Sequence, residues 1–121
     1  MTDYGPNAGD VVWTDFNPRT GREQGRRRPA LVVSPHEFYD GTRFIVVCPI
    51  TSRVRPFGSS VVLPAGSPVE GEILVAQIRT LDTLVRPLRF SGMKIDPDLL
   101  SAVRRKIAFL CGVSVRDLGA P

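Results

Sequence analysis

Arg26-Arg27-Arg28-Pro29-Ala30-Leu31-Val32-Val33-Ser34-Pro35 is the stretch that decides the fold of this chain. The aliphatic and β-branched residues after Pro29 predict a buried β-strand. Pro29 fixes its own φ and offers no N–H, so it marks the beginning of that strand. The guanidinium of Arg28 is therefore expected on a rigid element, where its planar fork of donors suits phosphate oxygens. The arginine run is explained either by phosphate binding or by an ordinary solvent-exposed loop. The residues around it are needed to distinguish the two.

Further short strands are predicted on both sides of this stretch, separated by polar turns. The loop at residues 17–28 contains Pro18, Gly21 and Gly25 and has no periodicity, and loops of this length in compact domains tend to be functional or mobile. An Asp40-Gly41 turn is expected to lead into the next strand. The expected strands cover residues 10–16, 29–34, 43–49, 59–63, one or two pieces within 72–80, and 84–90.

The hydrophobic period changes near the C-terminus, where a helix is predicted. Asp96 is a suitable N-cap, Pro97 suits the first helical position, and Gly112 suits the end. One apolar stripe follows at helical spacing, made of Leu99, Leu100, Val103, Ile107 and Leu110. Strands followed by a terminal helix predict an α+β fold that is mainly β, a small curled antiparallel barrel with a C-terminal helix. We expect a single domain over residues 1–121, with a core at about 9–112 and a tail at 113–121.

Composition narrows the function classes. No apolar run reaches the roughly 20 residues that a membrane span needs, and the N-terminus lacks the features of a signal peptide, so a cytoplasmic protein is expected. Two separated cysteines and one histidine do not suit a structural zinc site, and no metal or cofactor is expected. The net charge is +4, and 14 of the 16 basic residues are arginine. Arginines crowd two loops, which favours a polyanionic partner such as nucleic acid.

Two loop-to-strand junctions carry side chains that could perform chemistry. One supplies Glu23, Gln24 and Arg28, and the other supplies Thr51 and Ser52. Cleavage of a phosphodiester by its own 2′-hydroxyl needs a proton acceptor, a donor for the leaving oxygen and donors for the phosphorane. Since the nucleophile is already tethered to the phosphate, internal attack needs no metal. With His36 as the single histidine, a two-histidine ribonuclease site is excluded.

The order and spacing of these motifs resemble the MazF/PemK toxins. The resemblance spans about residues 9–112. It is carried by 9–18 (GDVVWTDFNP), 21–24 (GREQ), 28–35 (RPALVVSP), 47–52 (VCPITS), 57–63 (FGSSVVL) and 73–79 (ILVAQIR).

This resemblance implies a sequence-selective, metal-independent endoribonuclease toxin on an SH3-like barrel. Such a toxin is an mRNA interferase that cuts single-stranded RNA, forms a homodimer and is neutralised by a cognate antitoxin. The resemblance places the catalytic residues at Arg28 and Thr51, with Glu23 in a supporting role. A proton acceptor with an ordinary pKa is needed, so Glu23 is preferred to an arginine as base. The residues expected to bind RNA are Gln24, Arg26, Arg27, Ser52, Arg53, Arg55 and Gln77.

Several alternatives stay open at this stage. Trp13, Asp15 and Phe16 match the opening motif, but core packing or strand pairing also explains them. Gln77 either faces the RNA groove or satisfies backbone groups at a strand end. Two other functions are compatible with the fold: a non-enzymatic toxin resembling the gyrase-binding CcdB proteins, and a plain single-stranded RNA-binding barrel. The first relies on a Trp-Gly-Ile ending that this chain lacks, and the second favours exposed aromatic residues in loops, which are scarce here.

Overall fold

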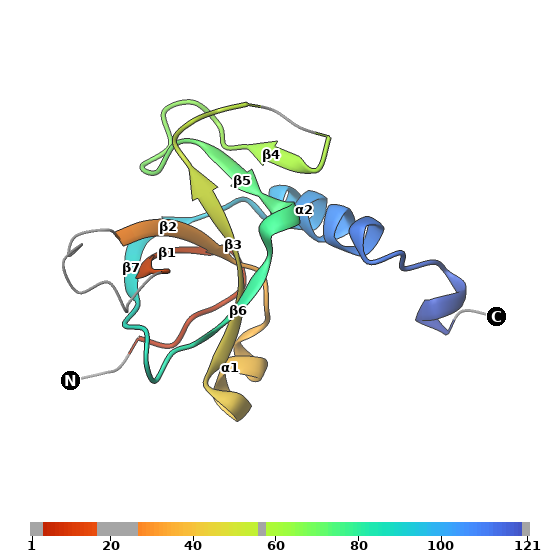
Figure 1. Ribbon diagram of the computed structural model, residues 1–121, viewed down its shortest axis with the longest axis horizontal. Coiled ribbons are helices and arrows are strands. Elements are labelled where there is room, and N and C mark those ends of the chain that lie inside the picture. The colour runs from red at the N-terminus through yellow and green to blue at the C-terminus, as the bar shows by residue number, and fades with distance from the viewer. Residues whose placement is uncertain (1–3, 17–26, 56–57, 120–121) are drawn as a thin grey trace.

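The computed structural model describes residues 4–16, 27–55 and 58–119 (Figure 1). The expected α+β class with predominant β structure is confirmed. The elements in chain order are β1 (Asp10–Asp15), β2 (Arg27–Val32), α1 (His36–Thr42), β3 (Phe44–Thr51), β4 (Ser60–Val62), β5 (Glu72–Leu74), the 3₁₀ turn η1 (Val75–Gln77), β6 (Arg79–Asp82), β7 (Arg89–Lys94), α2 (Pro97–Leu110) and the 3₁₀ turn η2 (Arg116–Leu118).

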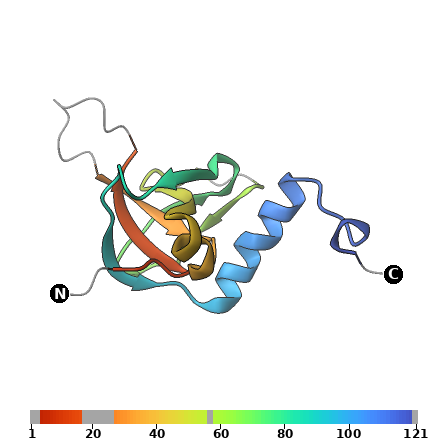
Figure 2. The same ribbon diagram turned by 90° about the horizontal axis from the view of Figure 1, so that it is seen from below.

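Within the described residues, seven antiparallel strands form one curled sheet in the order β4-β5-β3-β2-β1-β7, with β6 also paired to β3. The long strand β3 organises the sheet. Its residues 47–49 pair with β2, its N-terminal half pairs with β6, and its last two residues pair with β5. Figure 2 shows this sheet wrapping round, with α2 along one side. The C-terminal ends of β1 and β3 and the N-terminal end of β2 consequently meet at one edge of the sheet.

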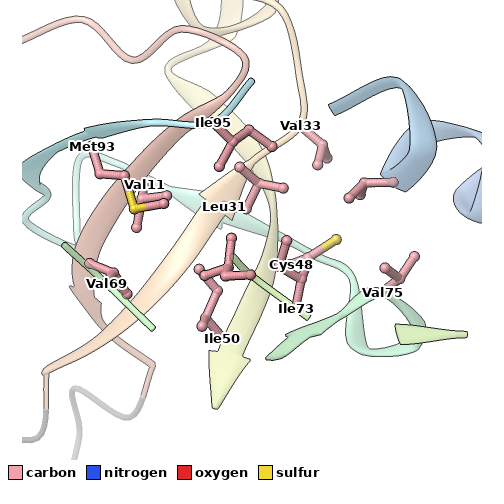
Figure 3. Packing of buried hydrophobic residues seen from close by; sticks show 12 residues of the cluster. Val11, Leu31, Val33, Cys48, Ile50, Val69, Ile73, Val75, Met93 and Ile95 are labelled. Atoms are coloured by element: carbon pink, nitrogen blue, oxygen red, sulfur yellow. The ribbon is translucent and has the colours of Figure 1, made fainter. Parts of the chain in front are cut away.

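Both faces of the sheet are buried, because successive side chains of a strand point to opposite faces. Val11, Leu31 and Cys48 belong to a core on the α2 side, part of which is drawn in Figure 3. Val12 and Val32 belong to a second core on the other face, where Tyr39 of α1 packs. The two cores use alternate residues of the same strands, and this explains why the strand after Pro29 is apolar without interruption.

The predicted C-terminal helix is confirmed, with both of its ends as expected. The side chain of Asp96 accepts a hydrogen bond from the N–H of Asp98 at 3.1 Å, and Pro97 begins α2. Gly112 has φ of +71°, and its N–H donates to the carbonyl of Phe109 at 3.0 Å, as in a Schellman ending. The apolar stripe is shorter than predicted, since Leu110 is 43% exposed.

Two predicted elements were wrong. In place of a turn at Asp40-Gly41, residues 36–42 form the short helix α1, whose last turn closes through Arg43 in the left-handed region at φ +65°. The last strand lies at Arg89–Lys94 and not at 84–90, because the Asp82 side chain and carbonyl hold residues 82–86 in a turn. In both cases local polar contacts outweighed the weak hydrophobic pattern.

Candidate active site

The register between β2 and β3 brings the two predicted junctions together. Ala30 pairs with Pro49, and in an antiparallel pair each step back along β2 matches one step forward along β3. Continuing that register by two positions sets Arg28 opposite Thr51. A cavity of about 440 Å³ lies there, and we call it the first cavity. It is lined by Trp13, Arg27, Arg28, Pro29, Ile50, Thr51, Ser52, Pro68, Val69 and Glu70.

Three neighbouring polar side chains give the first cavity its chemical character. Arg27 and Arg28 are exposed and supply two cationic donor groups. Thr51 is half-buried, and its Oγ1 accepts the N–H of Arg53 at 3.2 Å, which fixes the start of the following loop. Since that contact uses the oxygen as acceptor, the hydroxyl hydrogen can be donated to a ligand. The expectation that the two junctions converge is confirmed, while the catalytic roles of Arg28 and Thr51 stay a prediction.

A buried carboxylate, which sequence reasoning missed, supports the segment after Thr51. Glu72 on β5 pairs with Thr51 and is 1% exposed. Its carboxylate accepts the N–H of Arg55 at 2.9 Å and the hydroxyl of Ser60 on β4. A buried charge persists when hydrogen bonds compensate its lost hydration. Glu72 thus ties the loop that follows Thr51 to two strands.

Gly71 provides the space in which Thr51 sits. It has φ of +135°, and a Cβ at this position would lie 2.2 Å from the carbonyl oxygen of Thr51. No side chain fits there, so the close approach of the two backbones requires glycine. A glycine directly before an acidic residue, in an otherwise apolar strand, was the available signal in the sequence.

Glu70 is the acidic residue that lines the first cavity within the described residues. It is exposed, and its carboxylate accepts the N–H of Gly66 at 3.0 Å. The predicted base, Glu23, falls in residues 17–26 and lies outside the described residues, as do Gln24 and Arg26. Glu70 is therefore a second candidate for the proton acceptor, one that the sequence pattern did not single out.

The remaining predicted RNA-binding residues divide by position. Ser52 lines the first cavity beside Thr51. Arg53 and Arg55 are exposed on the following loop and do not line it. Gln77 is exposed on η1 and does not line it either. The first cavity thus brings together Arg27, Arg28, Thr51 and Ser52. The predicted RNA-binding residues Arg53, Arg55 and Gln77 lie outside it.

Neither a metal site nor a membrane-spanning helix is found among the described residues. No three His, Cys, Asp or Glu side chains among the described residues group closely enough to hold a metal ion. In the same residues no helix is long and apolar enough to cross a membrane. Burial raises the pKa of the Cys48 thiol to about 12, so this cysteine is an inert part of the core.

Known proteins share the sequence pattern and the fold of this chain. A family model described as "PemK-like, MazF-like toxin of type II toxin-antitoxin system" matches residues 7–111. The chain is 32% identical over 109 residues to the endoribonuclease toxin MazF of Escherichia coli K12, covering 90% of this chain and 96% of that protein. It is 36% identical over 102 residues to the endoribonuclease toxin ChpB of the same strain, covering 80% and 87%.

A solved structure points the same way. The structure of MazE-MazF (Form-II) from Deinococcus radiodurans has a TM-score of 0.81 and 38% identity, with 93% of this chain and 100% of that chain covered. Family match, curated relatives and fold agree over nearly the whole chain, so this protein belongs to the PemK-like, MazF-like toxins of type II toxin–antitoxin systems.

Proposed function

We propose that this protein is a toxin endoribonuclease that cleaves single-stranded RNA at selected sequences, without a metal, by attack of an internal 2′-hydroxyl. The observation that carries the proposal is the first cavity, in which Arg28 and Thr51 from separate strands face one space. Relatives that share 32% and 36% identity bear the name endoribonuclease toxin, which supports the same activity here.

The reaction forms one bond and breaks one. The 2′-oxygen bonds to phosphorus and the bond to the 5′-oxygen breaks, which leaves a 2′,3′-cyclic phosphate and a 5′-hydroxyl. Arg28 binds the nonbridging oxygens and stabilises the charge of the five-coordinate phosphorane, aided by Arg27. Thr51 donates its hydroxyl to the same phosphate or orients the 2′-hydroxyl, with Ser52 beside it.

A carboxylate takes the 2′-hydroxyl proton, and the departing 5′-oxygen takes a proton from a water molecule. Glu23, to which the family resemblance gives a supporting role, is the base preferred over an arginine on chemical grounds. Glu70 is the alternative, because it lines the first cavity with Arg28 and Thr51. Glu23→Gln and Glu70→Gln variants assign the role. The variant that lacks the base should lose the acidic limb of the pH–rate profile for cleavage, whereas the other variant should keep it.

Residues outside the first cavity set affinity, not chemistry. Arg53, Arg55 and Gln77, together with Gln24 and Arg26 of the preceding loop, contact the RNA strand on either side of the scissile phosphate. Since these are largely phosphate contacts, binding weakens steeply as salt rises. We further propose that the toxin works in the cytoplasm as a homodimer and that a cognate antitoxin with an acidic segment neutralises it. One of the solved relatives is a complex of MazE with MazF, and this supports such a partner.

Two single substitutions test the proposal. Arg28→Ala and Thr51→Ala should each lower kcat for RNA cleavage by at least ~100-fold, the usual loss when a transition-state donor is removed. Arg116→Ala, an exposed arginine on η2, is the matched control and should cleave like the parent protein. Circular dichroism and unfolding midpoints check that all variants fold. Cleavage retained by either site variant removes that residue from the mechanism.

Metal independence has its own test. Cleavage of RNA by the purified protein in excess EDTA should proceed at the untreated rate. Complete loss that Mg²⁺ restores would contradict internal attack without a metal.

A further inference from the structure

A second cavity of about 450 Å³ adjoins the first. It is lined by Trp13, Arg27, Arg89, Phe90 and Ser91. Trp13 and Arg27 line both cavities, so the two lie next to each other. Arg89, Phe90 and Ser91 belong to β7 and have no part in the site described above.

The strand register shows how the two cavities follow one another across the sheet. Arg89 of β7 pairs with Trp13 of β1, and Trp13 pairs with Pro29 of β2. From there the first cavity continues to Thr51 at the end of β3. The path therefore crosses four adjacent strands, three spacings of about 4.8 Å, or roughly 14 Å in all. That length exceeds one nucleotide, so the two cavities together have room for more than a single phosphate group.

A β-bulge shapes the second cavity. The register between β1 and β7 shifts between Val11 and Val12, and the extra residues on β7 include Gly92 with φ of +86°. In a regular strand, neighbouring side chains point to opposite faces, yet Arg89, Phe90 and Ser91 all line this cavity. The bulge twists the beginning of β7 and allows it. Bulges of this kind recur beside functional sites.

The aromatic wall of the second cavity is fixed in place. Phe90 is 41% exposed and stacks on Tyr4, with ring centroids 5.3 Å apart and an interplanar angle of 19°. The Tyr4 hydroxyl donates to Asp10 at 2.6 Å, and Asp10 also pairs with Lys94 at 2.8 Å. An ordered ring that stays partly open to solvent is a ready surface for stacking, because little side-chain freedom is lost on binding.

The charge of the cavity selects the class of ligand. Two guanidinium groups, an indole, a phenyl ring and a hydroxyl line it, and none of the five lining residues is acidic. Arginine beside exposed aromatic rings is the combination that holds a base by stacking and its phosphate by charge. Asp15 pairs with Arg27 in the sheet but does not line the cavity.

We propose that this second cavity is a nucleotide subsite of the RNA groove: it holds the base and phosphate next to the cleaved linkage, with Arg89 on the phosphate and Phe90 or Trp13 against the base. The assignment rests on the proposed endoribonuclease function. It makes Arg89 and Phe90 determinants of RNA affinity and base preference, not of the chemical step.

Binding can be measured apart from cleavage. The probe is a random-sequence 2′-O-methyl RNA 12-mer, which internal attack cannot cut. Trp13 is the single tryptophan and lines both cavities, so its fluorescence reports binding. Arg89→Gln should raise Kd about five- to tenfold at low salt and reduce the slope of log K against log salt by about 0.7. Phe90→Leu should raise Kd to a similar degree through lost stacking.

Arg116→Gln removes the same charge from η2 and should bind like the parent protein. A randomised RNA pool then gives cleavage junctions, in which Arg89→Gln and Phe90→Leu should relax the base preference at one flanking position only. Wild-type Kd, salt slope and junction preferences in both variants would overturn the subsite, even if the parent protein cleaves RNA. Weakened binding by both variants, with no cleavage by the parent protein, would support the subsite and refute the proposed function.

Discussion

Gly71→Ala is the substitution that most directly tests how the fold holds Thr51. The added Cβ would lie 2.2 Å from the carbonyl oxygen and 3.0 Å from the carbonyl carbon of Thr51, whereas ordinary contact begins near 3.4 Å. The difference, about 1 Å, is the distance that the end of β3 has to move. Because both contacts are with backbone atoms, no side-chain rotation can relieve them.

The size of the effect follows from this displacement. A misplacement of about 1 Å in a catalytic group costs on the order of 100-fold in rate. An alanine held at the positive φ of position 71 adds roughly 1–3 kcal/mol of strain to the folded state. We therefore expect kcat/KM for RNA cleavage to fall by about 100-fold, with a loss of about 2–4 kcal/mol in the free energy of unfolding.

Gly112→Ala separates displacement of Thr51 from loss of stability. Gly112 also has a positive φ, but nothing lies within 4 Å of its Cβ position, and it ends α2 far from the first cavity along the chain. This variant should lose about 1–2 kcal/mol and keep its activity. Cleavage is assayed well below both unfolding midpoints. If folded Gly71→Ala cleaves within twofold of the parent rate, the scaffold argument is refuted.

Three further predictions concern groups outside the site. Because Cys48 is buried and Cys111 is exposed, a thiol reagent should titrate one cysteine in the native protein and both after denaturation. Burial, followed by the neighbouring carboxylate, raises the pKa of Tyr4, whereas an unfolded tyrosine titrates near 10. Protonated Tyr4 thus contributes fully to the free energy of unfolding below pH ~10, and this contribution declines above that pH. Tyr4→Phe should therefore flatten the decline of the free energy of unfolding, measured by urea unfolding between pH 8 and 11. The guanidinium of Arg104 donates through two nitrogens to one backbone carbonyl, at 2.8 and 3.2 Å. Arg104→Gln should therefore cost about 1–2 kcal/mol of unfolding free energy, and equal stability of Arg104→Gln and Arg105→Gln would contradict that role.

Much of the fold was predictable because its signals are local. The aliphatic composition after Pro29 predicts a strand, and the apolar spacing after the N-cap Asp96 predicts a helix. Both predictions are confirmed. Helix α1 was missed because residues 36–42 carry no apolar period, and its last turn closes on Arg43 in a conformation usual for glycine. Local propensity gives no indication of such an ending.

The site was predictable only as far as each residue's own neighbourhood extends. Arg28 and Thr51 stand out at the ends of apolar strands, whereas Glu70, Gly71 and Glu72 gain their importance from register. Gly71 and Glu72 lie about twenty residues from Thr51 along the chain, and only the pairing of β3 with β5 brings them to it. No sequence pattern predicts the bulge in β7 either. Arg89 was therefore not expected near Trp13.

Glu72 holds the loop after Thr51 through the main-chain N–H of Arg55, a contact that does not depend on the loop's side chains. Residues such as Arg53 and Val54 can therefore be exchanged without loosening the threonine in front of them. Substitutions at these two positions should accordingly tune RNA affinity and its dependence on salt, while the geometry around Thr51 is inherited unchanged.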